Sequence, residues 1–155
     1  MTTSALPAFM LKMETDLAAL LPNVIVTLGQ PITSDPRGYL MIGIDDPETT
    51  SAATGASFNQ DWSTTGLSAF RSESGTVTCA ACDGNSDGDM RAAITSAAAL
   101  VSATETWART ASGSSLGIGS LEWAHVTGAE VFLSQNSSGA TALFVFTVAY
   151  EANLD

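Results

Sequence analysis

The segment Asp83–Asp89 is the part of this sequence whose spacing best suits a chemical site. It carries carboxylate and amide side chains at every second position around a glycine, which matches the first half of an EF-hand calcium loop. The second half does not match, because its twelfth position is Ile94 instead of a bidentate glutamate. The alternative is a strand-to-helix turn in which Asp87 or Asp89 caps backbone N–H groups. We favour the cap and expect no metal.

Cys79 and Cys82 are the only cysteines, and His125 is the only histidine. A C-x-x-C pair serves redox chemistry or supplies two of four zinc ligands. Here it falls in a segment predicted to be extended, where residues three apart point to opposite faces. His125 lies within another predicted strand, and no nucleophile motif accompanies it. We therefore expect no cofactor and no enzymatic activity.

Two amphipathic helices are predicted from apolar residues at helical spacing. The first spans Ser4–Leu21, with Thr3 or Ser4 available to cap its start and Pro7 in its first turn. The second spans Asp89–Thr110. Its apolar face is rich in alanine, which allows close packing against a sheet.

The remaining apolar segments have the pattern of strands. Val24–Leu28 and Tyr39–Ile44 are predicted to form a hairpin, and Leu67–Cys82 a long extended segment. Leu121–Gln135 and Ala140–Leu154 flank a polar turn and form a second hairpin. Because the last strand is apolar on both faces at its centre, we expect it inside the sheet.

The segment 45–66 is polar and is predicted to be a long loop, although 57–62 within it also fits a strand. Loops of this length are usually functional or disordered. Acidic pairs in such a segment are expected to be solvated and not catalytic. Residues 1–155 are thus predicted to form a single α+β domain, a mainly antiparallel sheet of about four to six strands packed with two helices.

Composition excludes several classes of partner. The chain has 155 residues, 16 acidic against 5 basic, and a formal net charge of −11. Without clustered cations it cannot neutralise phosphates, which argues against gripping nucleic acid or an anionic membrane. Its start lacks the pattern of a secretory signal, and no apolar run is long enough to cross a membrane. We expect a domain that folds in a cytoplasm and binds protein.

Aromatic and charged side chains are the candidates for contacts with subunits or partners. Large aromatics in polar segments are enriched at interfaces, although Trp107 and Trp123 also suit a core. The few arginines are expected to pair with carboxylates, within the chain or across a subunit boundary. The predicted interface residues are Asp45, Asp46, Glu48, Phe58, Trp62, Arg71, Glu73 and Arg109.

Five pieces of the sequence, in their order, resemble one family. They are Leu20–Val26 after the leading helix, Gly38–Gly43, Gly84–Ala93 opening the second helix, Val126–Gly128 and Gly139–Val148. Together with the chain length, this order resembles the tail terminator (tail tube completion) proteins of long-tailed bacteriophages. The resemblance covers nearly the whole chain. The long polar segment between Gly43 and Leu67 departs from the family pattern.

The resemblance implies a subunit that assembles into a homo-hexameric ring at the head-proximal end of the virion tail, after synthesis in the host cytoplasm. Such rings cap the tail tube at its set length and stop its polymerisation. Their other face receives the neck or head-completion proteins, and DNA passes through the lumen. The net charge adds a hypothesis of our own: carboxylates that line the lumen would repel DNA, so that it slides through.

Two alternatives remain open. A neck or head–tail connector protein, or a tail tube protein, would share this size and acidity. A tube protein is expected to form long polymers, whereas a terminator stops at a ring. A calcium-dependent binding module is the alternative of a different class, and it depends on the turn at 83–89.

Overall fold

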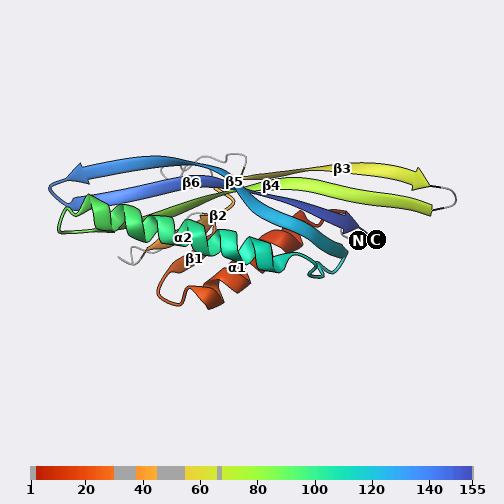
Figure 1. The fold of residues 1–155 in the computed structure, drawn as a ribbon, viewed down its shortest axis with the longest axis horizontal. Helices are drawn as coiled ribbons and strands as arrows, with labels where there is room; N and C mark the ends of the chain where they lie inside the picture. The colour runs from red at the N-terminus through yellow and green to blue at the C-terminus, as the bar shows by residue number, and fades with distance from the viewer. Residues whose placement is uncertain (1–2, 30–37, 45–54, 66–67, 155) are drawn as a thin grey trace.

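The computed structural model describes residues 3–29, 38–44, 55–65 and 68–154. Its elements are α1 (Leu6–Leu20), β1 (Ile25–Leu28), β2 (Tyr39–Ile42), β3 (Ala56–Thr65), β4 (Ser68–Asn85), α2 (Met90–Ala111), β5 (Gly119–Asn136) and β6 (Gly139–Leu154). The strands form one six-stranded, mostly antiparallel sheet. Both helices lie on the same face of it (Figure 1). The predicted α+β class is confirmed.

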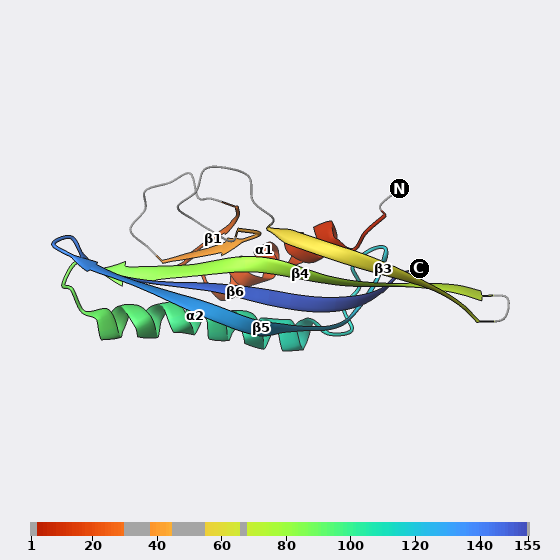
Figure 2. The ribbon, with the colours of Figure 1, turned by 90° about the horizontal axis from the view of Figure 1, so that it is seen from above.

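The strand order is β1-β2-β4-β6-β5, and β3 pairs with the first part of β4. β6 lies between β4 and β5, as its two apolar faces predicted. The molecule is elongated because two long hairpins extend toward opposite ends. The β3–β4 hairpin projects at one end and the β5–β6 hairpin at the other (Figures 1 and 2).

Alternation along β6 defines the two faces of the sheet. Its even-numbered residues from Ala140 to Leu154 are buried apart from Phe144, whereas its odd-numbered residues are partly or fully exposed. The even-numbered residues point to the helices, and we call this face the helix side. We call the opposite face the open side, because no described helix lies over it (Figure 1). Directly paired residues on neighbouring strands share a face.

The core lies between the helices and the sheet. The ring of Phe9 from α1 stacks on the ring of Tyr150 from β6, with 4.4 Å between the ring centroids. Its centroid lies 5.7 Å from that of the Trp107 ring of α2. Trp107 also donates from its indole nitrogen to Asp16 Oδ2 at 2.8 Å, which joins the two helices. Along α2 a row of alanines packs on small residues of β6, as its composition predicted; this second cluster contains Ala93, Ala97, Ala140 and Ala142.

β1 and β2 are parallel, so the predicted hairpin between them is wrong. Ile25 is level with Tyr39, and Leu28 with Ile42. Because the two strands are parallel, the connection between them must span the length of β1 to bring the chain back to the level at which β2 begins. A hairpin turn usually takes about two to five residues, and the stretch between Leu28 and Tyr39 is longer. That length allows the strands to run in the same direction.

The polar segment 45–66 is not one long loop, because it contains β3. Ala56–Thr65 pairs antiparallel with β4 along its whole length. The alternative of a strand at 57–62 is confirmed, and the strand is longer than that pattern. The pattern left it undecided because β3 pairs on one edge only and its described side chains are mostly exposed. Residues 45–54 lie outside the described part of the chain.

Gly75 in β4 provides a test of the packing in the core. A β-carbon added there would lie 2.5 Å from Tyr150 Cε1 and 2.7 Å from its hydroxyl oxygen. We predict that Gly75→Ala lowers the free energy of unfolding by about 1–3 kcal/mol, because the buried ring must move. Urea denaturation measures this. Gly128→Ala in β5 is the matched control, since its added carbon meets no atom within 4 Å, and equal midpoints for the two variants would contradict the prediction.

Candidate assembly surfaces

Glu73 is buried inside the subunit, so its predicted place at an interface is wrong. Its side chain is fully inaccessible. The Oε1 atom accepts hydrogen bonds from Ser4 Oγ (3.0 Å), the Ala5 backbone N–H (3.1 Å) and the Tyr150 hydroxyl (2.7 Å). The Oε2 atom accepts one from Gln60 Nε2 at 2.7 Å. The carboxylate therefore joins the start of α1 to β3, β4 and β6.

The same carboxylate, from a residue far along the chain, caps the start of α1. Ala5 stands at the N-cap position without a side-chain cap of its own. Its N–H is satisfied by Glu73, and the N–H of Leu6 is satisfied by Ser4 Oγ at 3.0 Å. A negative charge at a helix N-terminus also interacts favourably with the helix dipole. Ser4 thus contributes to the cap as predicted, but the main acceptor comes from β4.

Two of the predicted interface aromatics, Phe58 and Trp62, lie exposed on β3. Trp62 is 68% exposed, and the guanidinium carbon of Arg71 lies 5.2 Å from the centroid of its ring. Arg71 stands opposite Trp62 on β4. All three lie on the helix side. The β3–β4 hairpin that carries them projects beyond the helices at one end of the molecule (Figure 2). They form an exposed apolar surface with one cation.

A second exposed apolar surface lies on β5, and the sequence analysis missed it. Val131, Phe132 and Leu133 are 48%, 52% and 53% exposed. Val131 and Leu133 lie on the helix side, whereas Phe132 lies on the open side. A run of apolar residues indicates burial on both faces of a strand, but here β5 is the outermost strand of the sheet. The run itself was the available signal.

Of the other predicted interface residues, only Arg109 lies in the described part of the chain. Arg109 is exposed at the C-terminal end of α2 and forms an ion pair with Glu105, one helical turn earlier. Exposed pairs of this kind contribute little stability. Asp45, Asp46 and Glu48 lie outside the described residues.

The two remaining tryptophans have internal partners. Trp107 is buried in the core, so it is not an exposed anchor. Trp123 lies on the open side of β5, where its indole nitrogen donates to Glu151 Oε2 at 3.0 Å. The ring of His125 stacks on it at a centroid distance of 4.6 Å. His125 therefore supports an aromatic contact on the surface of the sheet.

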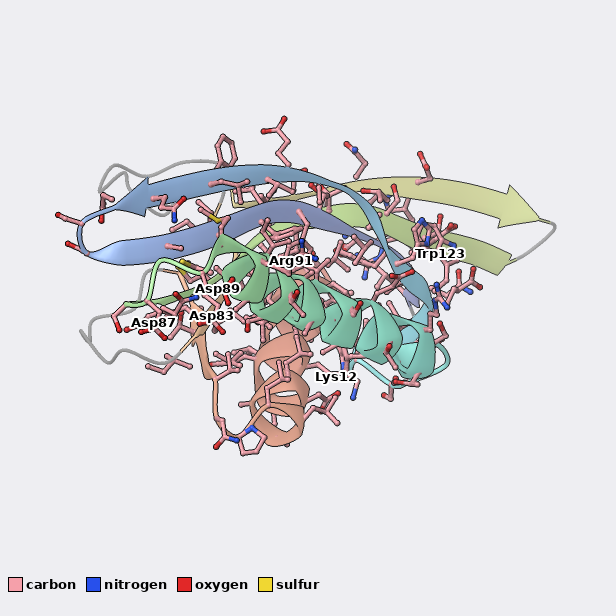
Figure 3. All side chains as sticks on the ribbon, turned by 60° about the vertical axis from the view of Figure 1, so that its left-hand side comes forward. Lys12, Asp83, Asp87, Asp89, Arg91 and Trp123 are labelled. Atoms are coloured by element: carbon pink, nitrogen blue, oxygen red, sulfur yellow. The ribbon has the colours of Figure 1, made fainter. Side chains whose placement is uncertain are left out.

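The turn at 83–89 is a helix cap. Asp89 Oδ1 accepts the Ala92 N–H at 3.1 Å, which confirms the predicted cap. The Asn85 side chain exchanges two hydrogen bonds with the backbone of Asp89, so its amide is already engaged. Figure 3 shows Asp83 and Asp87 near the same helix start. No three metal-ligating side chains come together anywhere in the described ranges.

Cys79 and Cys82 are both free and lie on opposite sides of β4. Cys79 is opposite Phe146 on the helix side, where burial raises the pKa of its thiol to about 12. Cys82 is opposite Leu143 on the open side, and burial together with the nearby Asp83 carboxylate raises its pKa. Both thiols are therefore protonated at neutral pH, which suits packing and not nucleophilic chemistry.

Charge is distributed unevenly between the two sides of the sheet. Among the described strand residues, the open side carries the carboxylates of Asp61, Glu130 and Glu151 but no lysine or arginine. Lys12 is paired with Asp16 at 2.9 Å on α1. On β4 the open side is otherwise rich in serine, threonine and alanine, and on β5 it carries the rings of Trp123 and Phe132. The charges of its described strand residues are thus acidic.

The bond from Tyr150 to Glu73 predicts how stability depends on pH. Burial, and then the Glu73 carboxylate, raises the pKa of Tyr150 above its ordinary value. Because the unfolded phenol titrates near about pH 10, the stability from this proton is complete below that pH and is lost as the pH rises above it. Tyr150→Phe should lose about 1.5–3 kcal/mol below pH 10, because the lost bond is to a carboxylate. Its stability should decline less steeply above that pH, measured by denaturation at several pH values. Parallel curves for the two proteins would contradict this.

No protein-family model matches the chain, and no curated protein matches it in sequence. Within the described ranges, no helix is both long and apolar enough to cross a membrane. The features that bear on function are therefore those of the subunit itself. They are the acidic open side and the two exposed apolar surfaces at opposite ends of the sheet.

Proposed function

We propose that this chain is a structural virion protein, a tail terminator that assembles into a homo-hexameric ring on the tail tube. The observation that carries the proposal is the position of the exposed apolar residues. Phe58 and Trp62 lie at one end of the sheet, and Val131–Leu133 lie at the other. Two different surfaces on one subunit favour head-to-tail contacts, which close into rings when the rotation between copies allows it.

The open side supports the proposed passage of DNA. In a ring whose subunits turn this side inward, Asp61, Glu130 and Glu151 would line the lumen. Phosphates would then be repelled on all sides, and the described strand residues offer no cation on that side to hold them. DNA is thus a passing cargo in this proposal. The stable partners are other copies of the chain, the tail tube protein and the neck proteins.

The proposal makes the chain a non-enzymatic protein of the virion. The ring's tube-facing end would stop further addition of tube subunits, and its other end would receive the neck or head-completion proteins. A neck protein or a tail tube protein fits the same surfaces. The calcium-binding alternative loses support, because Asn85 and Asp89 are engaged in the helix cap.

The assembly state of the purified protein tests the proposal. We predict rings of six copies that do not lengthen as the concentration rises, seen by negative-stain microscopy and native mass spectrometry. Added to preformed tail tubes, the protein should bind at one end and block further growth. Long filaments of the protein alone would identify a tube subunit, and rings that never bind tube ends would favour a neck protein.

Charge reversal on the open side tests the lumen. We predict that a double variant with Asp61→Lys and Glu130→Lys retains DNA in a gel-shift assay at low salt, because the lumen becomes cationic. The matched control is the double variant with Glu14→Lys and Asp87→Lys, which makes the same charge change on α1 and in the turn before α2. Equal DNA retention by the two variants would show that net charge, and not the open side, governs repulsion.

A further inference from the structure

Besides the four-residue β1, two long strands of the described sheet, β3 and β5, have an unpaired edge. In the described structure β6 is the only strand that pairs with β5, whose start (residues 119–121) also bonds to the loop 113–116. β4 is the only strand that pairs with β3. Each strand therefore presents a row of backbone N–H and C=O groups on its outer edge. Such edges readily add a strand from another chain.

The edge of β3 and the edge of β5 along residues 128–136 have no lysine, proline or bulge to protect them against strand addition. Natural edge strands are blunted by lysine, proline or bulges, and neither β3 nor β5 contains a lysine or a proline. The two bulges of β5 lie between Leu121 and Trp123 and between Val126 and Gly128. Beyond them, residues 128–136 pair regularly with β6 and include the exposed Val131–Leu133. This half of β5 is a long, apolar and regular edge.

The directions of the two strands suit each other. β3 is antiparallel to β4, β4 to β6, and β6 to β5, so β3 and β5 run in opposite directions. A second copy placed beside the first, with its helices on the same side, would bring β5 against β3 in antiparallel orientation. Both apolar surfaces would then contribute on the helix side, Phe58 and Trp62 from one copy and Val131 and Leu133 from the other.

Two different strands, β2 and β3, pair with the same edge of β4, and this limits where neighbouring copies can meet. β1 occupies the position beside β2, so the free edge next to β4 extends only along β3, residues 56–65. That length matches the regular part of β5, residues 128–136. We propose that residues 128–136 of β5 in one copy pair with β3 of the next copy. Neighbouring copies would be staggered along the strands, as closure of a sheet requires.

The register between β3 and β5 of neighbouring copies is limited by the side of the sheet that each residue occupies and by the positions of the carboxylates. To keep the helix sides together, even-numbered residues of β3 must stand opposite odd-numbered residues of β5. One such register sets Asp61 opposite Glu130, and like charges in direct opposition are destabilising. Moving the pairing by two residues sets Trp62 opposite Val131 and Asn59 opposite Ser134, and it separates the two carboxylates. We assign this second register.

The inference rests on the self-assembly in the proposed function, but not on binding to a tail tube. It names the contact between copies and makes the sheet continuous around the ring, with the open side facing inward. It fails independently of the proposed function if rings form through other surfaces. The test therefore measures ring formation and strand pairing separately.

Disulfide cross-linking tests the pairing. In a chain with Cys82→Ser, the double variant Asn59→Cys and Ser134→Cys should give a ladder of covalent oligomers up to six copies on a non-reducing gel after mild oxidation. Both substituted positions are exposed. The double variant Ser57→Cys and Ser134→Cys reports the neighbouring register and should cross-link at least tenfold less. The two single variants of the Asn59 and Ser134 pair should remain monomeric on the gel.

The outcomes separate the possibilities. A ladder from the first pair supports the assigned register. A stronger ladder from the second pair overturns the register, although it supports the pairing of these two edges. Rings without any ladder overturn the pairing of β5 with β3 and leave the proposed function standing. Dimers from Ser134→Cys alone also overturn that pairing, in favour of a two-fold β5–β5 contact. The absence of rings in unmodified protein counts against the proposed function itself.

A substitution supplies an independent measurement. Val131→Glu places a charge within the proposed contact and should raise the concentration needed for half-assembly at least tenfold in sedimentation experiments. Leu11→Glu is the control, because Leu11 is similarly exposed (55%) but lies on α1, away from both edges. Equal effects of the two variants would overturn the inference. Circular dichroism verifies that both remain folded.

Discussion

The carboxylate of Glu73 is the constraint on which the rest of this structure depends. A buried charge is costly unless hydrogen bonds replace its water, and here donors from α1, β3 and β6 do so. The position of each donor is consequently fixed relative to β4. Because Glu73 holds the first turn of α1 against the helix side, Phe9 reaches its stacking position on Tyr150. The contact between Phe9 and Tyr150 is part of the core between the helices and the sheet.

This closure on one side leaves the other side of the sheet open. The apolar surface of both helices is used on the helix side, and no described helix remains to cover the second face. That face tolerates exposure because its side chains are mainly small or polar. The β3–β4 hairpin extends beyond the helices, so Trp62 stays exposed, whereas Phe132 stays exposed because it lies on the open side. An asymmetric subunit with these surfaces is suited to association with copies of itself.

Local periodicity made much of this fold predictable, and its failures have physical causes. Both helices and the β5–β6 hairpin repeat their buried positions within a short stretch of sequence. β3 does not, because Asn59, Gln60 and Asp61 belong to an edge strand. The direction of β1 relative to β2 depends on β4, which lies far along the chain. The partners of Glu73 at Ser4 and Tyr150 are 69 and 77 residues away, so no local pattern could identify its role.

The net charge takes on a more specific meaning once the cations are located. Lys12 and Arg109 are paired with carboxylates on their own helices, and Arg71 lies over the ring of Trp62 on the helix side. The acidic residues of the open side thus have no basic neighbour among the described strand residues. An excess of carboxylates scattered over the whole surface would only favour solubility. In the described strands the sheet separates Asp61, Glu130 and Glu151 from Arg71. Under the proposed function, a ring with the open side inward would repel phosphate and form a channel in which DNA can move.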